Sequence, residues 1–351
     1  MRNFMIYGAS GHTGQLLARR AVEAGLRPVL GGRNAQALAA LARRLGLEYR
    51  AASIDEPRQL DRALAGLQTV LNAAGPFAAT AAPMVEACLR SRTHYLDVSG
   101  ELSVFAEIHR HDARARACGV LLLPGVGFLV LASDCLAAHV AQQLPGAVSL
   151  RIALSRPQFL SRGSRRTIVA SIREHVLIRR GGALAQVPVG ALRRRFDLGA
   201  GELDCSAING AEVFVSALST GIANIEIYAP ASASERALYR LGGSFAQLLR
   251  TAPAQLTLNA LADHWPGSDS RRSLRQVIVA IAEDAAGKKV ARRLRTPDAY
   301  EATATMALAA VSQVLHGLPH TGFHTPGAVF APELLFSLPG VSLEALASRA
   351  A

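Results

Sequence analysis

The sequence has few of the residues that mark several common protein classes. Aromatic residues make up 5% of its 351 residues, and no nucleic-acid recognition motif accompanies them, so we expect no nucleic-acid partner. Its four cysteines have no paired spacing, which favours reduced structural thiols in the cytosol and no metal site. We therefore disfavour a nucleic-acid-binding protein, a disulfide-bonded scaffold and a metalloprotein.

A long hydrophobic run is also missing. The longest apolar stretch, Val120 to Leu136, is interrupted by Pro124, two glycines and Asp134, so it does not predict a membrane span. A strand-like segment begins at residue 3, and we expect no signal peptide before it. Together these observations predict a cytoplasmic protein.

Lysine is scarce, and this excludes one reaction mechanism. Short-chain reductases use a tyrosine four residues before a lysine as proton donor. The chain has only Lys288 and Lys289, and the positions four residues before them hold Asp284 and Ala285. That proton donor is therefore absent.

The formal net charge of +12 is concentrated in two runs. Arg162 to Arg195 holds nine arginines and one acid, and Arg271 to Arg295 holds eight basic residues and two acids. Three interpretations stay open: solvated helix faces, attraction of an anionic or carrier-linked substrate, and peripheral contact with an anionic membrane or nucleic acid. Nucleic acid is the least favoured of these, because aromatic residues are sparse.

The most informative segment is a glycine loop near the N-terminus. It lies between a strand-like segment, Asn3 to Tyr7, and a helix-like segment, Gln15 to Ala24, and reads Gly8-Ala9-Ser10-Gly11-His12-Thr13-Gly14. Glycines at the first, fourth and seventh positions allow a tight bend, close approach of a pyrophosphate and close packing of helix on strand. The helix N-terminus adds free N–H groups and a partial positive charge, so the loop predicts dinucleotide binding.

The end of the next strand-like segment predicts which dinucleotide binds. Proteins that bind NAD usually place an acid there, on the ribose 2′-hydroxyl. This chain has Gly31-Gly32-Arg33-Asn34 instead, with no carboxylate. Because a guanidinium can hold a phosphate in a bidentate way, we expect NADP(H) rather than NAD(H). The alternative is a solvated arginine at a strand end.

Hydrophobic patterning predicts two domains and a C-terminal segment. Strands and helices alternate over residues 1–128, which predicts an NADP-binding Rossmann domain with a doubly wound parallel sheet. Residues 129–300 contain several strand-like runs, among them Val213 to Ala217, after a helical run from Ser164 to Ile178. They predict an α+β lobe with a mostly antiparallel sheet for substrate binding or dimerisation. Residues 301–351 are expected to return toward the Rossmann domain.

Several strand ends carry candidate site residues, because the carboxyl ends of parallel strands converge. Asp55 is placed to meet the adenine, or else serves as a helix cap or turn carboxylate. A small-residue segment is placed to pass the ribose and nicotinamide, or is an ordinary turn: Ala73, Ala74, Gly75, Pro76 and Phe77. The candidates for orienting a substrate or relaying a proton are Tyr95, Asp97, Ser99 and Glu101. Glu101 is equally suited to cap the following helix.

An ordered set of motifs resembles the saccharopine dehydrogenase-like reductases, and more narrowly their trans-acting enoyl reductase branch. Besides the glycine loop it includes Asn72–Phe77, Tyr95–Glu101, Pro124–Phe128, Ser219–Glu226 and Gly322–Pro326. The resemblance implies a Rossmann domain, a second lobe, a C-terminal return and a homodimer. It also implies nucleotide contacts at Gly8 to Gly14, Arg33, Asn34 and Ala73 to Phe77. One departure is Leu129, where the family pattern usually has an aspartate.

These patterns together predict an NADPH-dependent reductase. It would deliver hydride from C4 of the nicotinamide to a polarised C=C or C=N bond of a small-molecule or carrier-linked substrate. The alternative is a sensor that binds NADP(H) without turnover, because no proton donor is obvious in the sequence. A third hypothesis is a peripheral membrane protein that acts on lipid-linked substrates.

Overall fold

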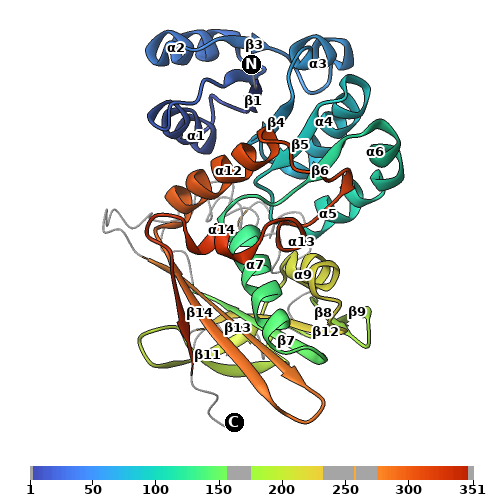
Figure 1. Ribbon diagram of the computed structural model, residues 1–351, viewed down its shortest axis with the longest axis vertical. Coiled ribbons are helices and arrows are strands. Elements are labelled where there is room, and N and C mark those ends of the chain that lie inside the picture. The colour runs from blue at the N-terminus through green and yellow to red at the C-terminus, as the bar shows by residue number, and fades with distance from the viewer. Residues whose placement is uncertain (1–2, 156–174, 232–256, 258–274, 347–351) are drawn as a thin grey trace. The chain divides into compact units, whose positions relative to one another are not determined.

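The structure is a computed structural model that describes residues 3–155, 175–231, 257 and 275–346 (Figure 1). The chain divides into two compact units. The parallel-sheet unit comprises Met1–Cys135 and Ala299–Pro339, and the mixed-sheet unit comprises Leu136–Asp298 and Gly340–Ala351. Helix α7 (Phe128–Gln143) continues from one unit into the other.

The parallel-sheet unit confirms the predicted doubly wound fold. Within the described residues its sheet has seven strands in the order β15-β6-β5-β4-β1-β2-β3, and every adjacent pair is parallel. The strands are β1 (Phe4–Tyr7), β2 (Val29–Gly32), β3 (Tyr49–Ala51), β4 (Thr69–Asn72), β5 (His94–Asp97), β6 (Leu121–Leu123) and β15 (Gly322–Phe323). The strand order reverses between β1 and β4, which is where such sheets bind their ligands.

Helices pack on this sheet according to their buried faces. They are α1 (His12–Glu23), α2 (Ala35–Leu45), α3 (Pro57–Leu64), α4 (Phe77–Ser91), α5 (Leu102–His109), α6 (Asp112–Cys118), α12 (Ala299–Leu315), α13 (Pro326–Val329) and α14 (Pro332–Phe336). Helix α12 lies beside α1, although the two are far apart in the sequence (Figure 1). An ion pair between Arg20 and Glu301, with 2.7 Å between nitrogen and oxygen, links them.

Helix α2 shows how local sequence sets the bounds of an element. Its N-cap is Asn34, whose Oδ1 accepts a hydrogen bond of 3.0 Å from the backbone N–H of Ala37. It ends at Gly46, which adopts a left-handed conformation with φ of 65°. Asparagine is favoured at the start of a helix and glycine at its end. The sequence pattern predicts a helix from Ala35 to Leu45, and the helix in the structure has the same bounds.

The sequence pattern predicts one helix from Val104 to Ala117, but the structure has two helices there. The run Val104 to Ala117 is interrupted between α5 and α6, and Asp112 begins α6. The Oδ1 atom of Asp112 accepts a hydrogen bond of 2.7 Å from the backbone N–H of Phe323. The break therefore places a carboxylate where it anchors the edge strand β15.

The mixed-sheet unit confirms the expectation of a second lobe with mainly antiparallel pairing. Its nine described strands include a path in the order β10-β11-β12-β7-β13-β14-β16, with β8 paired to β12 and β9. They are β7 (Ala147–Leu154), β8 (Val176–Arg180), β9 (Ala183–Val187), β10 (Arg193–Asp197), β11 (Glu202–Ala207), β12 (Asn224–Pro230), β13 (Gln276–Asp284), β14 (Lys289–Thr296) and β16 (Ser342–Ala345). Among the described pairs, β7 with β12 is the parallel one.

One expectation for this unit is wrong, and a second is wrong at its C-terminal end. Val213 to Ala217, predicted as a strand, lies in helix α9 (Glu212–Thr220). Alternating valines suggest a strand, but burial follows helical spacing and Gly221 ends the helix with φ of 72°. The helix predicted from Ser164 to Ile178 lies largely outside the described residues, and its last part, from Val176, is strand β8.

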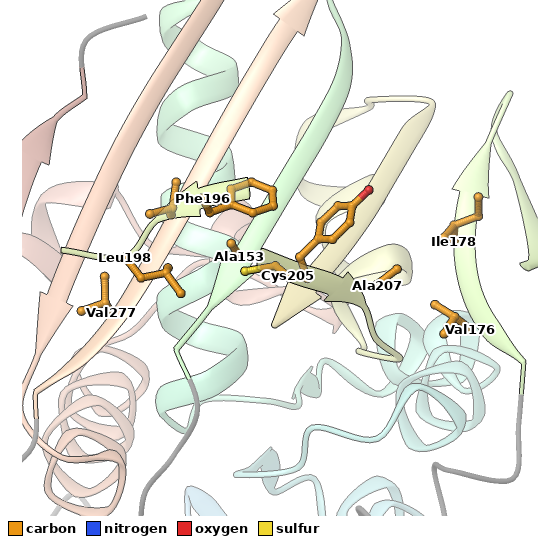
Figure 2. Close-up of a cluster of buried hydrophobic side chains, with 10 residues drawn as sticks. Ala153, Val176, Ile178, Phe196, Leu198, Cys205, Ala207 and Val277 are labelled. Atoms are coloured by element: carbon orange, nitrogen blue, oxygen red, sulfur yellow. The ribbon is translucent and has the colours of Figure 1, made fainter. Parts of the chain in front are cut away.

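A hydrophobic cluster covers one face of the mixed sheet (Figure 2). It gathers buried side chains from strands that are distant in the sequence, including Ala153 of β7, Phe196 of β10, Cys205 of β11 and Val277 of β13. The rings of Phe196 and Tyr228 meet with centroids 5.1 Å apart. Burial of these side chains supplies the main stabilisation of the sheet.

The described arginines of the two basic runs lie in strands and connecting turns rather than on helices. Several pair with acids across the sheet: Arg194 with Glu226, Arg195 with Glu202, and Arg293 with Glu344. The interpretation as solvated helix faces is therefore wrong for these parts of the runs. No helix in the described part of the chain is both long enough and apolar enough to cross a membrane.

Candidate functional site

The site is built where the strand order reverses, from the loops that follow β1 and β4. Gly8 ends β1 with φ of 84°, a left-handed conformation that favours glycine. A Cβ atom at this position would lie 2.7 Å from the backbone nitrogen of Ala74. The two loops therefore approach each other more closely than any side chain on Gly8 allows.

The N-terminus of α1 has the features of a phosphate site. Its N-cap is Gly11, and no side chain caps this end of the helix. Gly14 is buried, and a Cβ on it would collide with the carbonyl oxygen of Gly8. The glycines thus bring the helix start against the strand end and leave its amides available to an anion.

The neighbouring strand ends form a second part of the site, around Tyr7. Its hydroxyl donates a hydrogen bond of 3.0 Å to the carbonyl of Ala52, so its side chain reaches across β2 to the end of β3. Gly31 permits this crossing, because a Cβ there would lie 3.1 Å from the Tyr7 ring. Burial raises the pKa of Tyr7 to about 12, while the nearby charges of Arg33 and Asp55 act in opposite directions.

The three candidates for binding the adenosine end have different local roles. Arg33 is exposed at the end of β2, where a phosphate has access to it. Asn34 caps α2. Asp55 lies in a turn and accepts a hydrogen bond of 3.4 Å from the Ser53 hydroxyl, whereas the N-cap of α3 is Glu56. Of the two structural alternatives for Asp55, the turn is found.

The loop after β4 is held by its own polar residues. Ala73 N–H donates to the carbonyl of Tyr7 at 2.8 Å, and Ala74 N–H donates to Oδ1 of Asn72 at 3.0 Å. The hydroxyl of Thr80 donates to the Ala74 carbonyl at 2.6 Å. The Gly75–Pro76 peptide bond is cis, and Phe77 begins α4. The predicted small-residue segment therefore has one fixed path beside the glycine loop.

Three of the four residues expected to orient a substrate form a buried network. The carboxylate of Asp97 accepts from the hydroxyl of Tyr95 at 2.8 Å, from the backbone and hydroxyl of Ser99 at 2.9 and 2.7 Å, and from the backbone of Gly125 at 2.8 Å. Tyr95 and Asp97 are fully buried. Burial raises the pKa of Asp97, and the four hydrogen bonds oppose that rise. The network joins the ends of β5 and β6.

The fourth residue, Glu101, has a different environment. Its side chain is half-buried, and the backbone N–H of Ala78, in the first turn of α4, acts on the carboxyl group and lowers its pKa. It begins α5, but its side chain does not cap that helix. Burial raises the pKa of Glu101, and the charge of Asp97 raises it further. Glu101 thus lies at the start of α5, a helix that packs against α4.

Leu129 lies beside this carboxyl-bearing loop. Its side chain is 40% exposed, and a Cβ on Gly100 would lie 3.6 Å from its Cδ2 atom. The residue that departs from the family pattern therefore presents an apolar side chain next to the segment that carries Glu101.

Sequence reasoning missed some residues that shape the site. Tyr7 and Thr80 were not singled out, although each is a polar residue on or just after a strand end. The role of Asn72 was also missed: its Nδ2 atom lies 3.4 Å from the hydroxyls of both Thr80 and Tyr95. The signal available for Tyr7 was a polar aromatic residue directly before the glycine loop. His12 packs edge-on against Tyr300 of α12, with centroids 5.0 Å apart, and no sequence signal predicts that contact.

The residues present fit a dinucleotide. The glycine loop is a cradle that Cβ atoms would fill, the start of α1 has no side-chain cap, and Arg33 is exposed directly after β2. Within the described residues, no group of three or more histidines, cysteines, aspartates or glutamates could hold a metal ion. The fold and this site define a dinucleotide-binding protein of the Rossmann class.

Comparisons with known proteins specify the class further. Residues 4–123 match the family model of the saccharopine dehydrogenase NADP binding domain. A trans-acting enoyl reductase of Mycobacterium leprae (strain TN) is 31% identical over 140 residues, or 38% of this chain and 34% of that protein. A trans-acting enoyl reductase of Mycobacterium ulcerans (strain Agy99) is 31% identical over 146 residues, or 39% of this chain and 34% of that protein. The aligned region spans about a third of the length of these curated relatives.

A solved structure shares the fold of the whole chain. Apo saccharopine dehydrogenase (L-Glu forming) from Saccharomyces cerevisiae matches with a TM-score of 0.68, covering 99% of this chain and 100% of that chain at 12% sequence identity. At that identity the match supports the fold alone. Residues 4–123 are thus similar to the NADP binding domain of saccharopine dehydrogenase, which supports NADP(H) as the cofactor.

Proposed function

We propose that this protein is an NADPH-dependent reductase that transfers a hydride to a polarised C=C or C=N bond. The observation that carries the proposal is the close contact of the Gly8 and Ala74 loops at the reversal of strand order, beside the uncapped start of α1. In sheets of this class a dinucleotide lies across that reversal. When bound, NADPH would supply the hydride.

The proposed cofactor contacts are those predicted from the sequence. Gly8 to Gly14 would hold the diphosphate through backbone N–H groups, and Arg33, Asn34 and Asp55 would meet the adenosine end. Ala73 to Phe77 would line the ribose and nicotinamide. Tyr95, Asp97, Ser99 and Glu101, at the end of β5, would orient the substrate or handle its proton.

An enoyl group is the favoured substrate class. The relatives named trans-acting enoyl reductase share this region. Leu129 is apolar and exposed beside Gly100, which suits an apolar acyl chain better than a charged amino-acid imine. We propose a small-molecule or carrier-linked substrate, a homodimer and a cytoplasmic location. Because the described cysteines are not joined in disulfides, a reducing compartment suits them.

Binding and turnover assays test the proposal. The protein is titrated with NADPH and NADH by nucleotide fluorescence, and NADPH oxidation is followed with crotonyl pantetheine thioester and with 1-pyrroline. We expect NADPH to bind at least tenfold more tightly than NADH, a preference that Arg33→Ser abolishes. Oxidation with the thioester identifies C=C reduction. Failure to bind either nucleotide would contradict the proposal.

The sensor alternative is favoured by one observation. Tyr95, Asp97 and Ser99 are buried and hydrogen-bonded to one another, so they are already satisfied without a substrate. A protein that binds NADPH but oxidises it with neither probe fits this alternative. Contact with an anionic membrane is a separate proposal, tested by co-sedimentation with phosphatidylserine vesicles at low salt, where no pelleting would exclude it.

A further inference from the structure

Resting on the proposed function, we infer that Glu101 is the catalytic residue that donates the proton, and that Asp97 is a positioning residue behind it. Asp97 is the last residue of β5 and Glu101 immediately precedes α5, and their carboxyl groups have different surroundings. Asp97 is fully buried and faces four hydrogen-bond donors, whereas Glu101 is half-buried and reaches the first turn of α4.

Asp97 is fully buried, and both of its carboxylate oxygens accept hydrogen bonds from the protein. Its Oδ1 atom receives three donors, from the backbone and hydroxyl of Ser99 and the backbone of Gly125, and its Oδ2 atom receives the hydroxyl of Tyr95. Protonating it would disturb these bonds, and no part of it is exposed. Its geometry suits holding three segments in place rather than exchanging a proton with a substrate.

Glu101 satisfies the requirements of a general acid. It lies at the carboxyl edge of the sheet, beside the Ala73–Phe77 segment proposed to line the nicotinamide, and it remains partly accessible. The charged group acting on it is Asp97, and the N–H of Ala78 is the dipole acting on it from α4. Burial and the Asp97 charge both favour the protonated form, which moves the group toward neutral pH.

The proposed step balances as follows. One atom of the substrate double bond receives hydride, with its electron pair, from C4 of NADPH, which is oxidised to NADP⁺. The π electrons of that bond move to the second atom, which takes the proton from the Glu101 carboxyl. The carboxylate then regains a proton from water. For an enoyl thioester the second atom is the carbon next to the carbonyl.

The activity test compares Glu101→Gln with Glu107→Gln, which makes the same change on α5 at an exposed ion pair with Arg110. With crotonyl pantetheine and NADPH, we expect Glu101→Gln to lower kcat about 100-fold or more. NADPH affinity should change less than threefold, and Glu107→Gln should match the original protein. A kcat of Glu101→Gln within threefold of the original would overturn the assignment.

The pH profile separates the two carboxyl groups. Because the acid must be protonated, kcat of the original protein should fall as pH rises through the raised pKa of Glu101, and this limb should disappear in Glu101→Gln. Asp97→Asn removes the charge that raises the pKa of Glu101. The high-pH limb of the kcat profile should then move to lower pH. The profile of this variant is measured at a temperature where circular dichroism shows that the variant is folded. An unmoved limb would contradict the positioning role.

A stability measurement tests Glu101 without turnover. A carboxyl whose pKa is raised in the folded state contributes stability below its unfolded pKa and loses it as pH rises through the folded pKa. The free energy of unfolding of the original protein should therefore fall relative to Glu101→Gln as pH rises above about 4.5. Parallel pH profiles would overturn the assignment even if no probe is reduced. The fluorescence titration reports NADPH binding separately, and absence of binding would instead count against the proposed function.

Discussion

The two sheets place their charged and polar residues in different ways. In the parallel sheet the polar side chains gather at the carboxyl ends of adjacent strands, where Asn72, Tyr95 and Asp97 form one buried network. In the mixed sheet, charged residues lie opposite one another along the strands, as in the pairing of Arg293 with Glu344. The first arrangement makes a candidate site, and the second makes a series of local ion pairs.

The difference follows from strand direction. Parallel strands all end at one edge, so residues distant in the sequence converge there. Antiparallel neighbours bring opposite ends together and distribute their side chains over the faces. A run of arginines in antiparallel strands therefore favours ion pairs with neighbouring strands over a binding surface.

The largest expected effect breaks the buried network. Asp97→Ala leaves the donors of Tyr95, Ser99 and Gly125 buried without their acceptor. Each such group costs about 1–3 kcal/mol, so we expect a loss of roughly 3 kcal/mol or more in the free energy of unfolding. Urea denaturation followed by circular dichroism measures it. Asp97→Asn keeps one acceptor oxygen and should lose less free energy of unfolding than Asp97→Ala. Equal losses in the two variants would show that the hydrogen bonds do not account for the effect.

The next effect tests the close approach of the two loops. Gly8→Ala introduces a Cβ that would lie 2.7 Å from the backbone nitrogen of Ala74, so the loops must separate. The control is Gly66→Ala, since Gly66 has φ of 75° but a Cβ added there would have no neighbouring atom within 4 Å. The control should lose about 1 kcal/mol from backbone strain alone.

Gly8→Ala should lose roughly 1–3 kcal/mol beyond its control and weaken NADPH binding at least tenfold. Urea denaturation and fluorescence titration of the two variants measure these quantities. If both variants behave alike, contact between the loops contributes nothing to stability, and the proposed position of the dinucleotide loses its main support.

The comparison of the two sheets also explains how far the sequence predicted the structure. Helix α2 was predicted with its observed bounds because a capping asparagine, a helical apolar pattern and a terminal glycine all agree. Helix α9 was predicted as a strand because Val213 and Val215 alternate, and only its packing on β12 and β8 decides the outcome. Local pattern was sufficient where the signals agreed and failed where tertiary contacts decided.

The candidate site was predictable only in part, for a similar reason. The topology brings the predicted residues to one edge, and the glycine loop and the Ala73–Phe77 segment do adjoin. Position in the sequence did not distinguish Asp97 from Glu101, because Asp97 ends β5, Glu101 follows it by four residues and both are acids. Their difference depends on the donors that other segments supply, at Gly125 and Ala78. Such donors are backbone groups, which a residue pattern does not reveal.

The smallest expected effects lie in the mixed sheet and are measured by double-mutant cycles. Arg293 and Glu344 face each other on β14 and β16 with 2.6 Å between nitrogen and oxygen, and the Arg293 side chain is only 13% exposed. We expect a coupling free energy of about 0.5–1 kcal/mol. The pKa of Glu344 is lowered, chiefly by its hydrogen bond with Arg295, so the coupling should persist at neutral pH and vanish as pH falls through that lowered pKa.

A second cycle on Arg195 and Glu202 makes the comparison sharper. This pair is 3.2 Å apart with side chains 63% and 52% exposed, so water and salt screen it. Its coupling should be ~0.3 kcal/mol or less and disappear at high salt, while the Arg293–Glu344 coupling is reduced less. If the exposed pair coupled as strongly as the partly buried one, burial would not set the strength of these pairs. The arginines of the basic runs would then act through their summed charge rather than through local pairs. Binding to an anionic membrane or carrier requires such a summed charge.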